Sequence, residues 1–299
     1  MRRKSLAFVI VSQKNTRRGE AFTLANLKPM PELPEVETTR RGISPHILGK
    51  RFKTLIVRQS QLRWPVPDTL TSALPGLTLN QVARRGKYLL LVTDVGTVLL
   101  HLGMSGNLRI ATPDMEIRKH DHIDFVFDDN TVLRLNDQRK FGAVLWTSEP
   151  EKHPLLVNLG PEPLSEAFNS EYLNRRSRNR SVPIKNLIMD SHIVVGVGNI
   201  YANESLFLAG IHPNRPAGEI ALPDCQRLVD AIKTVLHQAI AQGGTTLRDF
   251  TDPLGKPGYF RQSLSVYGRS GQVCLRCEEP IQQMKIGQRA SYFCGNCQH

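Results

Sequence analysis

Residues 274–297 read CLRCEEPIQQMKIGQRASYFCGNC, and their four cysteines form two Cys-x2-Cys pairs with sixteen residues between the pairs. Zinc binds four thiolates tetrahedrally, and a gap of two residues lets both members of a pair reach one ion from a tight turn. Four sulfur ligands complete the coordination shell and leave no open position for catalysis. The spacing of Cys274, Cys277, Cys294 and Cys297 therefore predicts one structural zinc ion in a reducing compartment.

The residues between the cysteine pairs have the pattern of a β-hairpin, with two β-type segments joined near Gly287 and with Gln288 and Arg289 at the tip. A module of about 30 residues buries too little apolar surface to fold alone, whereas zinc binding supplies on the order of 10 kcal/mol. We therefore expect the metal to hold the hairpin. Taken by itself, Arg289 has the properties of a solvated turn residue. Cys225 stands apart and is expected to be a small core or surface residue.

The chain before the finger has helical periodicity. Residues 223–244 place Leu228, Ile232, Val235 and Ile240 along one face and end at Gly243 and Gly244. Residues 165–176 begin with Ser165, a residue type that caps helix N-termini. The segment "LGPEPL" (159–164) has the glycine and prolines of a linker. An α-helical domain is expected after it.

A glycine-rich segment, "VVGVGNIYANESLFLAGI" (194–211), lies inside this helical region. Gly196 and Gly198 resemble the start of a dinucleotide fingerprint, but Tyr201 replaces the third glycine and no parallel-sheet unit surrounds it, so we expect no such site. Two interpretations stay open. In the first interpretation, free backbone N–H groups and the Asn199 amide hold a phosphate. In the second, the turn only packs two helices.

Residues 51–147 contain short β-type runs separated by turn signals, a spacing that suits an antiparallel sandwich or barrel. The runs are FKTLIV, LTLNQVA, KYLLLVT, TVLLHL, HIDFVF, TVLRL and AVLWT. Two turns in this region carry Met104 and the pair Arg139 and Phe141. Individually these residues are ordinary core or surface residues. Together, in a domain that binds DNA, they form a wedge that fills the hole left by an extruded base.

Residues 32–49, "ELPEVETTRRGISPHILG", predict a helix of about four turns with an acidic first turn. Residues 1–30 differ in kind, because their apolar stretch is too short for a signal-peptide core and no clear cleavage site follows it. A transit peptide, a disordered extension and an overlong start assignment are the alternatives for this segment. We expect it to be absent from the active protein.

Composition sets broad limits. An apolar content of 40% with 22% charged residues is typical of a globular protein, and no apolar run approaches the ~20 residues needed to span a bilayer. Lys and Arg exceed Asp and Glu by 39 to 27, but residues 1–30 contain seven of the bases and one acid, which leaves 32 to 26. The net charge thus falls from +12 to +6. Charge alone supports a nucleic-acid partner weakly.

Together, the motifs from residue 30 to 299 resemble those of the formamidopyrimidine-DNA glycosylases, bacterial enzymes that remove oxidised purines from DNA. They are PELPEVET, RRGKYLLL, HLGMSG, KHDH, LGPEPL, VVGVGNIYANESLF, GGTTLRDF, GKPGYF and the four-cysteine finger. The resemblance implies an α+β protein with an N-terminal β-sandwich, a helix-two-turn-helix domain and a zinc finger. It also implies a cytoplasmic monomer that excises 8-oxoguanine and formamidopyrimidines from damaged duplex DNA and cuts the strand by β,δ-elimination.

The resemblance assigns roles to four catalytic residues. Pro31 is the nucleophile, which requires that its nitrogen be a free secondary amine, because an internal proline nitrogen has no available lone pair. Glu32 is the acid that protonates the sugar ring oxygen, and Glu35 supports the local charge pattern. Lys87 contacts DNA and donates the proton in β-elimination. Arg289 acts in δ-elimination and phosphate binding.

The resemblance also assigns DNA contacts. His120, Arg139 and Asn199 contact the DNA, Met104, Arg139 and Phe141 fill the void, and residues 246–260 close over the extruded base. The sequence departs from the family pattern at Gln138, Lys140 and Ser181, each of which alters expected phosphate contacts.

The expected organisation is an extension (1–30), a β-sandwich domain (31–160), a helix-two-turn-helix domain (161–262) and the finger (263–299). One alternative is an endonuclease VIII-type glycosylase, which acts on oxidised pyrimidines. The other is a non-catalytic DNA-binding zinc-finger protein, which would follow if the extension stays attached to Pro31.

Overall fold

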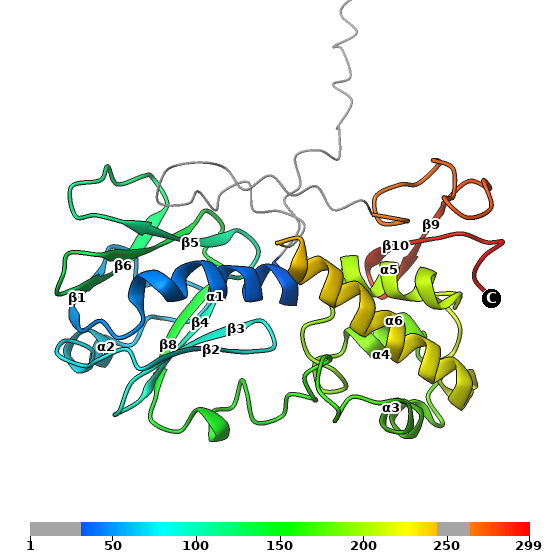
Figure 1. The fold of residues 1–299 in the computed structure, drawn as a ribbon, viewed down its shortest axis with the longest axis horizontal. Helices are drawn as coiled ribbons and strands as arrows, with labels where there is room; N and C mark the ends of the chain where they lie inside the picture. Colours follow the sequence, from blue (N-terminus) through cyan, green and yellow to red (C-terminus); the bar gives the residue numbers. More distant parts are fainter. Residues whose placement is uncertain (1–30, 244–263) are drawn as a thin grey trace, which may run out of the picture.

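The computed structural model describes residues 31–243 and 264–299. The extension (1–30) and the loop predicted to close over a base (246–260) therefore lie outside the described residues. Figure 1 shows a β-rich part and a helical part side by side, with helices α1 and α6 meeting between them and the C-terminal hairpin beside α5. Within the described ranges, none of the helices has both the length and the apolar character required to cross a bilayer.

The β-rich part is a sandwich of two antiparallel four-stranded sheets, as the runs predicted. One sheet has the order β1 (Phe52–Val57), β6 (Asp121–Phe127), β7 (Val132–Asp137), β5 (Gly106–Ala111). The other has the order β2 (Gln81–Arg85), β3 (Tyr88–Val92), β4 (Thr97–His101), β8 (Ala143–Thr147). Their apolar side chains, such as Phe125 and Leu89, form one buried core between the sheets.

Helix α1 (Leu33–Ile47) packs against this core, and a helix was expected here from the sequence pattern. Its apolar residues Val36, Ile43 and Ile47 are buried in the sandwich core. A short helix, α2 (Asp68–Ala73), follows strand β1. Strand β5 was not among the predicted runs. Its alternation places Leu108 in the core while Arg109 pairs with Asp121 on the other face, which hides the apolar signal.

The helical part consists of α3 (Ser170–Ser177), α4 (Ile184–Met189), α5 (Asn199–Ala209) and α6 (Leu222–Ala241), with a short 3-10 turn at Ala217–Glu219; another 3-10 turn, at Pro150–Lys152, follows strand β8 before the helices begin. The predicted helix start at Ser165 is wrong. The side chain of Asn169 accepts the N–H of Tyr172 and caps α3, whereas the Ser165 hydroxyl donates to the Glu162 carbonyl in the preceding turn.

Helix α6 has the predicted apolar face, and Leu228, Ile232 and Val235 are all buried in the core of the helical part. Cys225 is fully buried in the same core, so of the two predicted alternatives it is a core residue and not a surface residue.

Strands β9 (Gln282–Ile286) and β10 (Arg289–Phe293) form the predicted hairpin. Arg289 pairs with Ile286, so Gly287 and Gln288 make a two-residue turn in which both φ angles are positive, 54° and 63°. This is the geometry of a type I′ turn, whose twist matches that of the strands. The hairpin packs on α5, where the Tyr292 N–H donates to the Asn203 side-chain oxygen at 2.8 Å.

Candidate active site

The carboxylate of Glu32, the residue after Pro31, caps the N-terminus of helix α5. It accepts the backbone N–H groups of Gly198 at 2.9 Å, Ile200 at 2.9 Å and Tyr201 at 3.4 Å. A Cβ atom on Gly198 would lie 2.2 Å from the Glu32 carboxyl carbon, so this position requires glycine. The interpretation in which these free N–H groups hold a phosphate is therefore wrong, because a carboxylate of the same chain binds them.

The other glycine of this turn, Gly196, lets the start of α1 lie close to the turn. Gly196 has a φ of +83°, and a Cβ atom there would lie 2.4 Å from a methyl carbon of Leu33. The Leu33 N–H donates to the Gly196 carbonyl at 3.2 Å. The residues that follow Pro31 are thus fixed against the helical part, and Pro31 itself is partly exposed.

Glu35 lies one helical turn further along α1. Its carboxylate accepts the Glu32 N–H at 2.9 Å and the Tyr201 hydroxyl at 2.7 Å. Glu35 therefore caps the first turn of α1, while the Glu32 carboxylate points to α5. The interpretation in which both acids only cap the first helix is therefore wrong, because Glu35 also accepts the Tyr201 hydroxyl of α5 and Glu32 accepts backbone N–H groups at the start of α5.

The pKa of Glu32 is raised to about 7, mainly by burial and in part by the charge of Glu35, while Lys87 and the α5 N–H groups oppose the shift. Lys87 is on the turn between β2 and β3. Desolvation lowers the pKa of Lys87, Glu32 and Glu35 raise it, and Arg289 adds to the lowering. A carboxyl that titrates near neutrality beside a lysine with a depressed pKa is suited to proton transfer at neutral pH.

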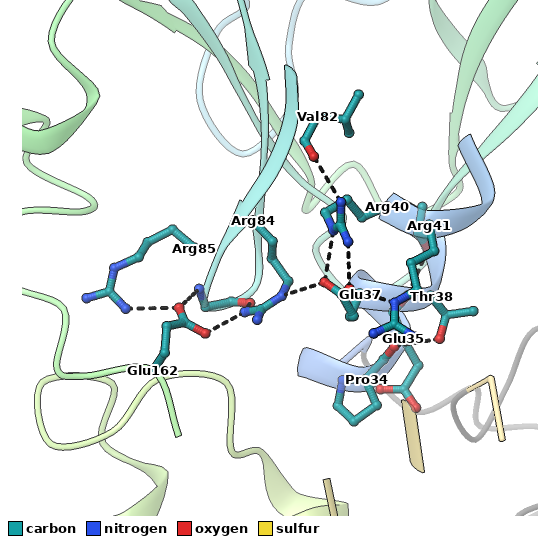
Figure 2. A network of polar contacts seen from close by, with 12 residues as sticks. Pro34, Glu35, Glu37, Thr38, Arg40, Arg41, Val82, Arg84, Arg85 and Glu162 are labelled. Atoms are coloured by element: carbon teal, nitrogen blue, oxygen red, sulfur yellow. Dashed lines mark hydrogen bonds and ion pairs between the residues drawn. The ribbon is translucent and has the colours of Figure 1, made fainter. Parts of the chain in front are cut away.

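Figure 2 shows the ion-pair network that holds the Lys87 turn. Glu162, in the segment between the sandwich and the helices, accepts the Gly86 N–H at 2.7 Å and pairs with Arg84 at 2.7 Å and Arg85 at 3.0 Å. Arg84 also pairs with Glu37 of α1 at 3.1 Å. The network therefore joins α1, the β2–β3 turn and the connection between the two parts.

The α1 end of this network is strongly ionised. Burial favours the neutral form of Glu37, but hydrogen bonds from Arg40, Arg41 and Arg84 outweigh it and lower the pKa to about 2. Glu37 thus stays charged at all physiological pH values.

Arg289 begins β10 next to Ala290, whose carbonyl is held by two side chains of the helical part. It accepts the Asn199 amide at 3.1 Å and the Lys185 ammonium at 3.0 Å. Lys185 also donates to the Ser291 hydroxyl at 2.6 Å and is fully buried. Desolvation, with the charge of Arg289, lowers the pKa of Lys185 to about 7. Sequence reasoning missed Lys185, because a lysine in a short helix carries no signal of burial.

The residues predicted as a wedge lie together at two adjacent turns of the sandwich. The Arg139 guanidinium lies over the Phe141 ring, 4.7 Å from its centroid. A Cβ atom on Gly103, next to Met104, would lie 2.4 Å from the Phe141 carbonyl carbon, so the two turns touch backbone to backbone. Arg139 and Phe141 are exposed and Met104 is partly exposed. His120 belongs to the neighbouring loop, and its carbonyl accepts the Asp137 N–H at 3.0 Å.

The four finger cysteines form a metal centre. Their sulfur atoms all lie within 4.8 Å of one another, with 3.4 Å between Cys277 and Cys294 and 3.9 Å between Cys274 and Cys297. Four zinc–sulfur bonds of about 2.3 Å in a tetrahedron separate the sulfurs by about 3.8 Å. The residues fit one structural zinc ion, as their spacing predicted.

Family models match three successive parts of the chain. The formamidopyrimidine-DNA glycosylase N-terminal domain matches residues 30–144, the formamidopyrimidine-DNA glycosylase H2TH domain matches 159–251, and a zinc finger found in FPG and IleRS matches 271–299. The site residues described above, from Pro31 to the finger cysteines, all fall within these matches.

Individual relatives and solved structures agree with these models. Formamidopyrimidine-DNA glycosylases of Acidithiobacillus ferrooxidans and Thioalkalivibrio sulfidiphilus are both 58% identical, over 90% of this chain and 100% of their own length. A mutant FPG of Lactococcus lactis, in complex with a Fapy-dG containing DNA, superposes with a TM-score of 0.83 at 34% identity over 90% of this chain and 100% of that one. The MutM (FPG) protein of Thermus thermophilus gives 0.79 at 37% identity, over 90% and 98%. This chain belongs to the formamidopyrimidine-DNA glycosylase family.

Proposed function

We propose that Pro31, Glu32, Lys87 and Arg289 perform the chemistry of this DNA glycosylase and AP lyase on oxidised purines in duplex DNA. The observation that carries the proposal is the Glu32 carboxyl, which is buried directly after Pro31 and has a pKa raised to about 7. A general acid is most effective when its pKa lies near the working pH.

The nucleophile is the Pro31 nitrogen as a free secondary amine. An α-amine of pKa near 8 is neutral in roughly one molecule in ten at pH 7, whereas a lysine of pKa near 10.4 is neutral in roughly one in a few thousand. The amine attacks the sugar C1′, the bond to the damaged base breaks, and the base leaves with the electron pair of that bond and takes up the proton that the amine loses. The ring oxygen then leaves C1′ with a proton from Glu32, and an iminium ion forms between Pro31 and C1′.

The iminium ion acidifies the 2′ hydrogens, so loss of a 2′ proton expels the 3′ phosphate and cuts the strand. Lys87 supplies a proton in this β-elimination, and Arg289 binds phosphate and assists the δ-elimination that follows. The electrostatic coupling of Lys87 to Glu32 and Arg289 supports placing these groups around one reaction centre.

The DNA contacts are part of the same proposal. His120, Arg139 and Asn199 contact the DNA, and Met104, Arg139 and Phe141 fill the space that the extruded base leaves. The protein acts as a cytoplasmic monomer with a sandwich (31–160), a helical domain (161–262) and a finger (263–299). Lesion-containing and abasic DNA are the ligands of the Lactococcus lactis structures.

This chemistry requires a Pro31 that is not acylated by Met30. The alignments support this, because 269 residues of this chain cover 100% of the Acidithiobacillus ferrooxidans relative, and the first family match begins at residue 30. The full chain with Met30 attached is therefore expected to bind DNA without forming the iminium ion.

Borohydride trapping tests the proposal. Protein that begins at Pro31 and protein that retains residues 1–30 are incubated with an 8-oxoguanine:C duplex and borohydride, and the adduct is mapped by mass spectrometry. We expect a covalent adduct on Pro31 only in the first protein. An adduct on a lysine, or equal trapping in both proteins, would contradict the role of Pro31, and preference for a thymine-glycol:A duplex would instead indicate the endonuclease VIII-type specificity.

A further inference from the structure

The turns that carry the void-filling side chains share one buried carboxylate. Asp137, the last residue of β7, is fully buried. We propose that Asp137 is a positioning residue that joins these turns into one rigid unit, so that Met104, Arg139 and Phe141 enter the DNA together. The inference rests on the void-filling part of the proposed function.

Both oxygens of Asp137 are used, and they bind different turns. Oδ1 accepts the Ser105 hydroxyl at 2.6 Å and the Arg139 N–H at 3.3 Å. Oδ2 accepts the Gly142 N–H at 2.7 Å. Ser105 follows Met104, and Gly142 follows Phe141. Every void-filling residue is therefore itself bound to Asp137 or adjacent to a residue that is.

The bonds form a closed arrangement between the turns. The Ser105 hydroxyl donates to Asp137 and accepts the Arg139 N–H at 2.9 Å, so the first turn also holds the second directly. Glycines allow this approach. A Cβ atom on Gly142 would lie 3.0 Å from Asp137 Oδ2 and 2.9 Å from the His101 carbonyl oxygen.

The backbone of Asp137 extends the unit to the loop of a third proposed DNA contact. Its N–H donates to the His120 carbonyl at 3.0 Å. Its carbonyl oxygen lies 2.8 Å from His122 Nε2 and accepts the Lys140 N–H at 3.3 Å. One residue thus fixes the relative positions of the loops that carry His120, Met104 and Arg139.

A carboxylate is required here because all three groups that face the Asp137 side chain are donors. An asparagine of the same shape would direct its NH2 group at one set of donors, which leaves buried polar groups unpaired. The turns would then move independently, and ordering them in the DNA would cost entropy that the rigid unit does not lose. Catalytic groups such as Glu32 would keep their positions.

The test compares Asp137→Asn with a matched control in protein that begins at Pro31. Asp124→Asn alters another buried carboxylate of the same sheet, which pairs with Arg58 and Arg134 and has no contact with the two turns among its described hydrogen bonds. Two substrates are used: 8-oxoguanine paired with cytosine in a duplex, which needs void filling, and a preformed abasic site in a single strand, which does not.

We expect Asp137→Asn to lower kcat/KM for the duplex lesion about tenfold or more and to change cleavage of the single-stranded abasic site less than about threefold. Ser105→Ala, which removes one bond to Asp137, should shift the duplex reaction in the same direction by a smaller factor. Asp124→Asn should leave the ratio of the two substrates unchanged even if it lowers the melting temperature.

An equal loss on both substrates, or no loss on the duplex lesion for either Asp137→Asn or Ser105→Ala, would overturn the inference. Failure of the underlying proposal has a different signature. If Met104→Ala and Phe141→Ala leave duplex excision unchanged, void filling by these side chains is wrong, whatever Asp137 does. Because Ser105→Ala removes two hydrogen bonds but leaves the Asp137 carboxylate and its bond from Gly142 in place, it answers the question even if Asp137→Asn does not fold.

Discussion

At the residue scale, Glu32 carries the strongest evidence for chemistry, and its environment explains why. Its carboxylate accepts three N–H groups at the positive end of α5, which favours the charged form, yet burial and Glu35 outweigh them. The result is a group near half-protonation at neutral pH. The sequence alone predicted the identity of this acid but not its partners, because Gly198 lies more than 160 residues away in the chain.

The raised pKa of Glu32 makes a prediction about stability and pH. Its folded value of about 7 exceeds its ordinary value of 4.5, so the folded state binds more protons between these pH values. The stabilising contribution of the protonated form is complete below pH 4.5 and is lost as the pH rises through 7. The loss amounts to about 3 kcal/mol by the relation between pKa shift and free energy.

Glu32→Gln removes this titration. Both proteins are unfolded with denaturant between pH 4.5 and 8. We expect the free energy of unfolding of the wild type to fall with rising pH relative to that of the variant. The same variant should bind lesion-containing DNA but fail to excise the base, because glutamine has no proton to donate. Parallel pH curves would show that Glu32 is not perturbed, and full excision would refute its role as the acid.

At the element scale, sequence patterns predicted those elements whose apolar period is uninterrupted. Helix α1 and the apolar face of α6 follow directly from the spacing of their buried residues. Strand β5 was missed because Arg109 is buried by pairing with Asp121, and a buried charge has no signature in a hydrophobic pattern. The start of α3 was misplaced because both Ser165 and Asn169 are good capping residues, and only the fold selects between them.

The β2–β3 turn provides a prediction at this scale. Glu162→Gln should weaken the ion pairs that residue 162 forms with Arg84 and Arg85 and that hold the turn carrying Lys87 (Figure 2). Because the Glu162 side chain is 26% exposed, the stability cost should be at most about 1 kcal/mol. Lys87 would be less well placed, so strand cleavage at an abasic site should slow by about threefold to tenfold.

Single-turnover kinetics on abasic DNA measure this change. Glu149→Gln is the control, because Glu149 and Lys152 form an exposed ion pair on the sandwich side of the connection, and this variant should cleave at the wild-type rate. If Glu162→Gln also cleaves at the wild-type rate, the network supports the fold without positioning Lys87.

At the scale of the whole molecule, the candidate site combines residues from all three parts of the fold. Glu32 and Lys87 come from the sandwich region, the N–H groups that hold Glu32 come from α5, and Arg289 comes from the finger. Motifs identified these residues one by one. Their assembly depends on packing between distant elements, for which a single sequence has no local pattern.

Zinc removal tests how the finger contributes to this assembly. The hairpin has a small core, in which Val266 and Tyr292 pack around the cysteines, so most of its stability must come from the metal. Without zinc the hairpin should unfold, and the bonds from Lys185 and Asn199 to Ala290 should break. Arg289 would then leave the site, and DNA affinity should fall steeply.

The sandwich and helical cores do not include the metal, so the main thermal transition should persist after chelation while hydrogen-exchange protection of residues 282–293 disappears. Cys294→Ser should reproduce both effects. Cys225→Ala, which removes a buried thiol from the helical core instead, should retain one zinc per chain and protection of the hairpin. A zinc-free protein that keeps hairpin protection and DNA affinity would show that packing on α5, and not the metal, holds Arg289 in place.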